Sequence, residues 1–253
     1  MASPDKQRYF INSLARGLSF LDTFSSSKPQ LGLSELAEAN NMTLGTCTRY
    51  IFTLNNLSYI VRDPVTKKYA LTPKILSLGL HLLKNMELRS RVLPYMIETT
   101  RDLDVTTQCA ILDETEIVYV ERVRSKDVVN LDLTAGSRLP CYCTALGKAI
   151  LAFEKRDKAA GIINNIKFAP HTPHTITDKV KFGKELELTR RRGYATNDQE
   201  LTLGLKTLAV PVFKSDLVQG AIGISYPINR VENNDLEKVF IETLRDISAK
   251  TSI

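Results

Sequence analysis

Residues 33–57 read LSELAEANNMTLGTCTRYIFTLNNL, and this stretch decides the fold of the first third of the chain. A short helix is predicted at its start, with Ser34 as the capping residue. The Asn pair at 40–41 indicates a tight turn, and a longer helix is predicted from just after Thr43 to Leu57. The inward stripe of this longer helix consists of Cys47, Tyr50, Ile51, Leu54 and Leu57. Two helices joined by a tight turn are typical of a helix-turn-helix.

The segments on either side complete a winged helix. Upstream, a helix is predicted to begin at Asn12 or Ser13, and its apolar positions are Leu14, Leu18, Leu21 and Phe24. Downstream, residues 59–62 and 67–71 are predicted as two strands joined by a turn. The side chains expected to anchor this hairpin are Tyr59, Val61, Tyr69 and Leu71. A helix-turn-helix followed by such a wing predicts a DNA-binding domain over residues 1–72.

Lysine and arginine are unevenly distributed along the chain. Residues 1–85 contain ten Lys and Arg against five Asp and Glu, a net charge of +5. Residues 86–253 contain twenty-four against twenty-three, a net charge of +1. A basic segment joined to a neutral one indicates a polyanionic partner, and a merely basic surface is the alternative.

The longer helix of the pair is predicted to enter the major groove of double-stranded DNA. Its first turns are expected to present Gly45, Thr46, Thr48 and Arg49 to bases or phosphates. The wing adds Arg62, Lys67 and Lys68 as phosphate contacts. Arg49 can pair with a guanine edge or with a phosphate, and the sequence alone does not decide between the base contact and the phosphate contact.

A leucine-rich helix is predicted to begin at Thr72-Pro73, since proline is well tolerated in a first turn. Its apolar face is broader than one packing contact needs and consists of Ile75, Leu76, Leu78, Leu80, Leu82 and Leu83. We therefore expect residues 73–86 to form a linker helix that pairs with its copy in a second subunit. A helix packed inside one subunit is the alternative.

Residues 87–253 are predicted to form a larger domain of the α+β class with a largely antiparallel sheet. Strands are predicted at 106–112, 117–123, 128–133, 194–195, 207–213 and 219–226. Helices are predicted at 88–103, 145–153, 157–163, 178–193 and 233–249, and Thr144 caps the second of these. The run Arg190-Arg191-Arg192 ends a helix, where the helix dipole favours cations, so we interpret it as structural.

The composition argues against several other classes of protein. The chain has no apolar stretch of membrane-spanning length and no signal-peptide core, so we expect a cytoplasmic protein. Cys141-x-Cys143 with His171 and His174 fits no standard zinc spacing, and no catalytic pairing is evident. We therefore expect neither an enzyme nor a bound cofactor. A redox-responsive or metal-responsive regulator that uses Cys109, Cys141 and Cys143 is the alternative.

Four colinear stretches of the chain resemble the IclR family of transcriptional regulators. They are SLARGL at 13–18, the helix-turn-helix at 33–57, GSRLPCYCTALGKAIL at 136–151 and RRGYATNDQELTLGLKTLAVPV at 191–212. The resemblance covers nearly the whole chain, from about residue 10 to residue 248. It implies a GAF-like domain that binds a small organic-acid effector, and homodimers or homotetramers that act on operator DNA as repressor or activator.

By the same resemblance, the effector pocket comprises Val128, Leu131, Thr144, Ala145, Leu146, Asn197, Leu205, Thr207, Gly223 and Ser225. Backbone N–H groups at the helix start after Thr144 can receive a carboxylate, and the leucines can pack against a carbon skeleton. Asn197 stands where members often have an acid, and Thr207 and Gly223 stand where some have Cys and Ser. These departures point away from very small keto acids. Residues 10–13 and 142–144 resemble the branch that controls aromatic-acid catabolism, which favours an aromatic acid.

Overall fold

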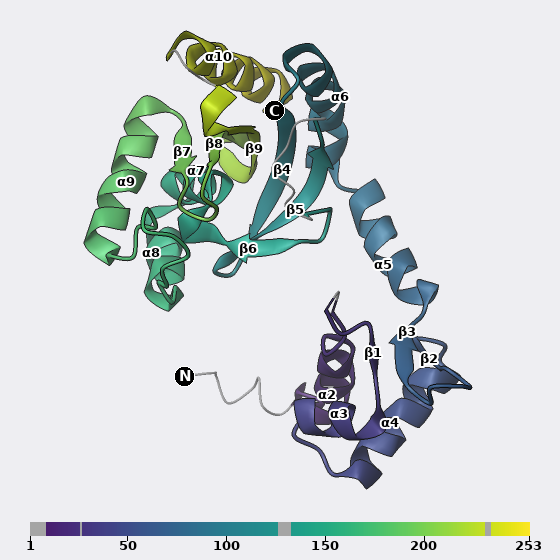
Figure 1. Ribbon diagram of the computed structural model, residues 1–253. Helices are drawn as coiled ribbons and strands as arrows, with labels where there is room; N and C mark the ends of the chain where they lie inside the picture. Colours follow the sequence, from purple (N-terminus) through teal and green to yellow (C-terminus); the bar gives the residue numbers. More distant parts are fainter. Residues whose placement is uncertain (1–8, 26, 126–132, 231–233) are drawn as a thin grey trace. The chain divides into compact units, whose positions relative to one another are not determined.

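The computed structural model describes residues 9–25, 27–125, 133–230 and 234–253. The chain divides into two compact units, Met1–Asn85 and Met86–Ile253, and each has its own buried core (Figure 1). No helix within the described ranges combines the length and the apolar character that a membrane crossing needs.

The first unit consists of helices and a small antiparallel sheet in the order β1-β3-β2. Its elements are α2 (Asn12–Leu21), β1 (Gln30–Leu31), α3 (Leu33–Ala39), α4 (Leu44–Asn56), β2 (Ile60–Arg62), β3 (Tyr69–Leu71) and α5 (Pro73–Lys84). The core comprises Phe20, Leu31, Leu36, Ala37, Cys47, Ile51, Leu54 and Ile60. The helix-turn-helix and the wing are therefore present as predicted, and β1 is an additional strand.

Four details of this unit differ from the sequence-based prediction. Gly32, not Ser34, precedes the first turn of α3, and its N–H donates to the Glu35 carboxylate at 2.7 Å. The anchor of the wing is Ile60, which is 1% exposed, whereas Val61 is 52% exposed. Because side chains alternate along a strand, a shift of one residue exchanges the buried and solvent faces.

In α2 the predicted apolar stripe is also displaced. Leu14 and Leu18 are exposed, whereas Phe20 is fully buried. Leu57, at the end of the predicted stripe of α4, is exposed as well. Only the second half of the predicted stripe, Leu21 and Phe24, therefore packs against the core of this unit.

Helix α5 begins at Pro73, and the Thr72 side chain caps it by accepting from the N–H of Lys74 at 3.3 Å. None of its residues is buried in the single chain, and Leu76, Leu78, Leu80 and Leu82 are exposed. Four of the six residues of the leucine-rich face are therefore exposed in the single chain, whereas Ile75 and Leu83 are half-buried.

The second unit is a six-stranded antiparallel sheet in the order β6-β5-β4-β9-β8-β7 with helices on both faces. Its strands are β4 (Thr106–Asp113), β5 (Glu116–Val123), β6 (Arg138–Pro140), β7 (Ala195–Asp198), β8 (Leu205–Lys214) and β9 (Leu217–Pro227). Its helices are α6 (Glu87–Leu103), η1 (Cys141–Cys143), α7 (Ala145–Phe153), α8 (Arg156–Asn165), α9 (Lys179–Arg192), η2 (Ile228–Arg230) and α10 (Asn234–Thr251).

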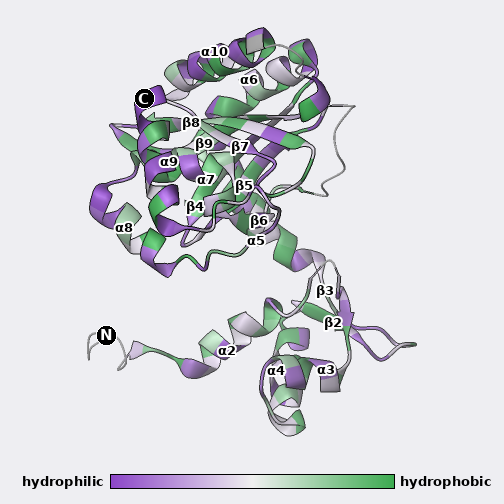
Figure 2. Cartoon of the chain, turned by 60° about the vertical axis from the view of Figure 1, so that its left-hand side comes forward, coloured by the Kyte–Doolittle hydropathy of each residue, from purple (hydrophilic) through white to green (hydrophobic). Residues whose placement is uncertain are grey.

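Helices α6 and α10 cover one face of this sheet, and α7 lies on the other (Figure 2). The α+β class and the antiparallel sheet agree with the prediction. The predicted strand at 128–133 falls almost entirely outside the described residues, as do Val128 and Leu131. The short strand β6 was not predicted. Arg192, in the basic run that ends α9, pairs with Glu185 at 2.7 Å, which supports a structural role for that run.

Helix α7 lies very close to η1 because residue 147 is glycine. A Cβ atom at Gly147 would come within 2.2 Å of the Cys141 carbonyl oxygen. The Thr144 hydroxyl accepts from the N–H of Gly147 at 3.2 Å, so it caps the helix as predicted. This packing places the N-terminus of α7 against the sheet.

Candidate functional site

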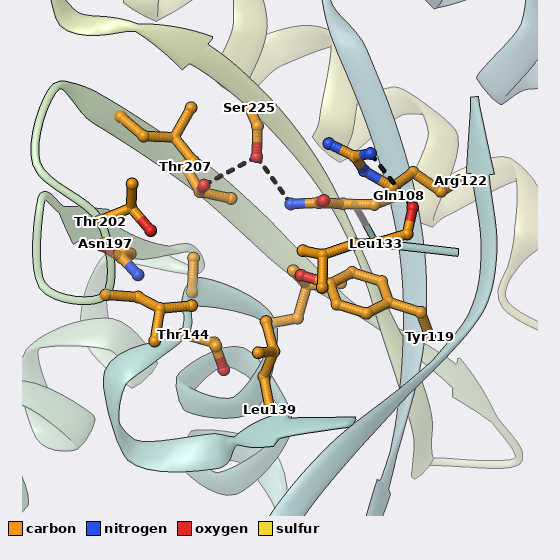
Figure 3. A pocket seen from close by; sticks show the side chains of 14 residues that line it. Gln108, Tyr119, Arg122, Leu133, Leu139, Thr144, Asn197, Thr202, Thr207 and Ser225 are labelled. Atoms are coloured by element: carbon orange, nitrogen blue, oxygen red, sulfur yellow. Dashed lines mark hydrogen bonds between the residues drawn. The ribbon is translucent and has the colours of Figure 1, made fainter. Parts of the chain in front are cut away.

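A small cavity lies between the N-terminus of α7 and the sheet of the second unit (Figure 3). Fourteen residues line it: Gln108, Tyr119, Arg122, Leu133, Leu139, Thr144, Ala145, Leu146, Asn197, Leu201, Thr202, Leu205, Thr207 and Ser225. Its volume is about 20 Å³, which is enough for one water molecule. A larger ligand can enter only if some of these side chains move.

Seven of the residues expected in the effector pocket lie together in this lining: Thr144, Ala145, Leu146, Asn197, Leu205, Thr207 and Ser225. Gly223 is not in the lining. A Cβ atom at Gly223 would be 3.5 Å from Leu146 Cδ1 and 2.8 Å from the Leu208 carbonyl oxygen. The absence of a side chain at Gly223 therefore allows Leu146, which lines the cavity, to pack closely against β9. Val128 and Leu131 lie outside the described residues.

The sequence reasoning missed seven lining residues: Gln108, Tyr119, Arg122, Leu133, Leu139, Leu201 and Thr202. Gln108 could have been found from the sequence, because it is the one amide in the predicted strand at 106–112, where it follows two threonines. The others depend on how strands and loops pair in space. Leu201 and Thr202 come from the loop between β7 and β8, which covers the cavity.

One end of the cavity is a chain of three buried polar side chains. Gln108 Nε2 donates to Ser225 Oγ at 2.7 Å, and Ser225 Oγ lies 2.8 Å from Thr207 Oγ1 (Figure 3). These residues come from adjacent strands, because β4 pairs with β9 and β9 pairs with β8. A hydroxyl can both donate and accept, so this end can bind a hydroxyl or carbonyl group of a ligand.

The other end of the cavity is the N-terminus of α7, after Thr144 (Figure 3). The first N–H groups of a helix have no partner within the helix, and the helix dipole favours negative charge there. Tyr119 and Leu139 form an apolar wall between the two polar ends (Figure 3). Leu146 belongs to the same lining. The cavity therefore combines an anion-favouring end, an apolar wall and a hydroxyl-binding end.

Arg122 is a half-buried cation in the lining. Its Nη1 donates to the Leu133 carbonyl oxygen at 3.2 Å. Burial lowers the pKa of Arg122, and the nearby charge of Arg124 lowers it further. Burial also raises the pKa of the Tyr119 phenol, so this group is a neutral hydroxyl at physiological pH.

Asn197 holds the loop that covers the cavity. Its Nδ2 donates to the Cys143 carbonyl oxygen at 2.5 Å, and its Oδ1 accepts from the N–H of Glu200 at 2.9 Å. The Thr175 hydroxyl donates to the Glu200 carbonyl oxygen at 2.6 Å. Asn197 thus connects η1 to the β7–β8 loop, a role that was not predicted for it.

An ion pair between Lys148 and Glu200 lies beneath this loop. The Lys148 side chain is 1% exposed and the Glu200 side chain 8% exposed. Lys148 Nζ also donates to the Thr196 carbonyl oxygen at 3.1 Å. Burial raises the pKa of Glu200, and Lys148 partly offsets this rise. The pair links α7 to the same loop.

The cysteines do not have the surroundings of reactive thiols. Cys47, Cys109, Cys141 and Cys143 are all buried and form no disulfide. Burial raises the pKa of Cys109, Cys141 and Cys143 to about 12. Within the described ranges, no three His, Cys, Asp or Glu side chains are grouped as a metal site. A low-pKa thiolate, which a redox sensor needs, is therefore not favoured at these positions.

In the first unit, the residues expected to contact DNA lie on α4 and the wing. Gly45, Thr48 and Arg49 are exposed, and Thr46 is half-buried beside a groove lined by leucines of α2. Arg62 Nε donates to the Lys67 carbonyl oxygen at 3.3 Å. Lys67 Nζ donates to the Pro64 carbonyl oxygen at 2.6 Å, and Lys68 Nζ lies 3.7 Å from the Glu35 carboxylate. All three basic residues of the wing are exposed.

The chain is similar to known proteins over nearly its whole length. The family described as "IclR helix-turn-helix domain" matches residues 13–64, and "Bacterial transcriptional regulator IclR C-terminal" matches residues 80–253. The HTH-type transcriptional regulator KdgR of Escherichia coli strain K12 is 29% identical over 99% of this chain and 95% of its own length. The Pca regulon regulatory protein of Pseudomonas putida is 30% identical over 93% of this chain and 81% of its own length.

A solved structure shows the same fold. It is an IclR homologue from Microbacterium hydrocarbonoxydans, crystallised in complex with 4-hydroxybenzoate. Its TM-score to this chain is 0.81 at 22% identity, with 94% of this chain and 97% of that chain covered.

Proposed function

Because this chain belongs to the IclR family of transcriptional regulators, we propose that it binds a specific operator and that a small aromatic acid controls this binding. The single observation that carries the effector half is the cavity under the β7–β8 loop, with an apolar wall beside two polar ends (Figure 3). A ring carboxylate would lie at the N-terminus of α7, and a ring hydroxyl would bond to Thr207 and Ser225. We place this activity in the cytoplasm, where the DNA is.

Binding of such an acid must move side chains, because the cavity volume is only about 20 Å³. A ligand can shift a conformational equilibrium only by as much as it binds one state better than the other. The effector therefore favours a state in which the β7–β8 loop has moved, and operator affinity changes by the coupling free energy between the two sites.

The effector is tested by thermal unfolding of the purified full-length protein. We expect 4-hydroxybenzoate or protocatechuate to raise the melting temperature, since a ligand at 100 times its Kd stabilises by about 2.7 kcal/mol. Glyoxylate and pyruvate should have no effect. Thr207→Val and Ser225→Ala should lose the response, whereas Ser90→Ala, at an exposed serine of α6, should keep it. Stabilisation by glyoxylate or pyruvate alone would contradict the proposal.

The operator half is tested by electrophoretic mobility shift with the promoter region beside this protein's own gene. If Arg49 reads a base, Arg49→Ala should weaken specific binding by about 1–3 kcal/mol. Lys68→Ala should weaken binding to all sequences and lower the salt dependence of the affinity by about one counterion. Unchanged binding by Arg49→Ala would mean that another face of the unit meets DNA.

We also propose that the chain acts as a homodimer, or as a homotetramer built from dimers, with α5 pairing with its copy. The exposed leucines of α5 support this, because none of them is buried within the described part of one chain. Leu76→Glu should shift the sedimentation coefficient toward that of a monomer. Leu203→Glu, at an exposed leucine of the β7–β8 loop, serves as the control. A Leu76→Glu variant that sediments like the wild type would contradict pairing through α5.

A further inference from the structure

Phe52 is a large apolar side chain on the solvent side of α4. It is 70% exposed, whereas the other bulky apolar side chains of this helix, apart from Leu44 at its first position, face the core or line the groove against α2. Successive residues of a helix are rotated by about 100°, so the face opposite buried Cys47, Ile51 and Leu54 contains Arg49 and Phe52. Phe52 therefore shares its face with the arginine expected to contact DNA.

The neighbours of Phe52 leave this face poor in free hydrogen-bonding groups. The Thr48 hydroxyl, one turn before Phe52, donates to the Leu44 carbonyl oxygen at 2.8 Å. Gly45 has no side chain, and a Cβ atom there would meet no atom within 4 Å. Asn56, on the same face, donates through its Nδ2 to the Phe52 carbonyl oxygen at 3.0 Å. The face that Arg49 and Phe52 share therefore presents one guanidinium, one amide, one methyl group and one aromatic ring.

Two possible occupants of this face can be compared. A second copy of the chain would pack on the leucine-lined groove between α2 and α4, and Thr46 and Arg49 also line this groove whereas Phe52 does not. Duplex DNA matches the net charge of +5 in residues 1–85. Gly45 and Phe52 are seven residues apart, or about 10 Å along the helix, and the major groove is about 12 Å wide. The charge and the spacing favour DNA.

We propose that Phe52 reads the 5-methyl group of a thymine in the major groove, next to the base or phosphate that Arg49 contacts. Thymine is the only base with a methyl group on its major-groove edge, and apolar side chains recognise it by contact. This inference rests on the proposed operator binding and adds a base identity to it. It assigns Phe52 as a specificity-determining residue whose loss relaxes discrimination between thymine and uracil.

The test removes the methyl group from the DNA and the ring from the protein. The full-length protein selects its preferred sequence from a pool of random duplexes, and each thymine of that sequence is then replaced singly by deoxyuridine. Fluorescence anisotropy gives the Kd of each duplex for the wild type, for Phe52→Ala and for the control Val180→Ala, at an exposed valine of α9. Because Phe52 is exposed, its replacement should leave the melting temperature unchanged.

We expect one thymine per half-site at which deoxyuridine weakens wild-type binding about fourfold, the factor that corresponds to burying one methylene-sized group. Phe52→Ala should weaken binding to the thymine duplex and show no further loss with deoxyuridine at that position. Val180→Ala should behave as the wild type does.

An equal deoxyuridine effect in wild type and Phe52→Ala at every position would overturn the inference, even though specific binding persists. A Phe52→Ala protein that sediments as a smaller species with an unchanged uracil response would assign the face to a protein contact and also overturn it. Failure to select any sequence would instead overturn the operator binding on which it rests.

Discussion

Lys148 and Glu200 form an ion pair that is almost completely removed from water, so replacing one member alone should destabilise the second unit strongly. Lys148→Met leaves the Glu200 carboxylate buried, and Glu200→Gln leaves the Lys148 ammonium buried. Breaking a buried pair in this way costs about 3–5 kcal/mol, whereas replacing both members by neutral groups of similar size is often close to neutral. The double variant should therefore be more stable than either single variant.

Differential scanning calorimetry measures the effect. For a unit of this size, about 1 kcal/mol corresponds to about 2–4 °C, so each single variant should melt about 6–20 °C below the wild type. Single variants that melt with the wild type would refute the reasoning. So would a double variant whose loss equals the sum of the single losses, because no coupling would then exist between the two groups.

The pH dependence distinguishes the two single variants. Without Lys148, the pKa of Glu200 in the folded protein rises further above its value in the unfolded protein. The protein then loses folding stability as the pH rises from the unfolded pKa to the folded pKa of this carboxyl. Lys148→Met should therefore regain stability as the pH is lowered from about 8 to about 5.5. Glu200→Gln removes this carboxyl, so its stability should show no such gain as the pH is lowered.

Three further outcomes follow from the buried core. Cys141 and Cys143 should react with iodoacetamide at pH 8 about a thousand times more slowly in the native than in the unfolded protein, because burial raises the pKa of each to about 12; rapid native alkylation would restore the redox alternative. Gly147→Ala should lower stability by about 1–3 kcal/mol or more in urea unfolding, since the new methyl group would overlap the Cys141 carbonyl. Ile60→Ala should lower the free energy of unfolding by about 2–5 kcal/mol, whereas Val61→Ala should change it by no more than about 0.5 kcal/mol. Equal losses for the two variants would contradict the observed register of the wing.

Periodicity predicted the long elements of this chain well, and it failed where a single residue decides. The cap of α7 could be predicted because Thr144 directly precedes a strongly apolar helix. The start of α3 could not, because the Glu35 carboxylate binds a backbone N–H there and no serine side chain is needed. In the wing, Ile60 and Val61 are equally apolar, and only packing against the core decides which is buried.

In the candidate site, too, some residues could be predicted from the sequence and others could not. Thr207 and Ser225 were expected in the pocket because the family resemblance carries their positions, and the antiparallel register places them opposite each other. Tyr119 and Arg122 come from β5, and they reach the cavity only through the pairing of β5 with β4 and the bulge in that pairing. Pairing between strands far apart in sequence is set by tertiary packing, so local patterns do not contain it.

Helix α5 has twelve residues, none of which is buried in one chain. A helix of fewer than about 12–15 residues is marginal in water on its own. Its order should therefore depend on association with another chain, and association depends on how many copies a cell contains. At low copy number, more of the protein would be monomeric and α5 would be less ordered. The abundance of this regulator would then itself set how strongly effector binding is coupled to DNA binding.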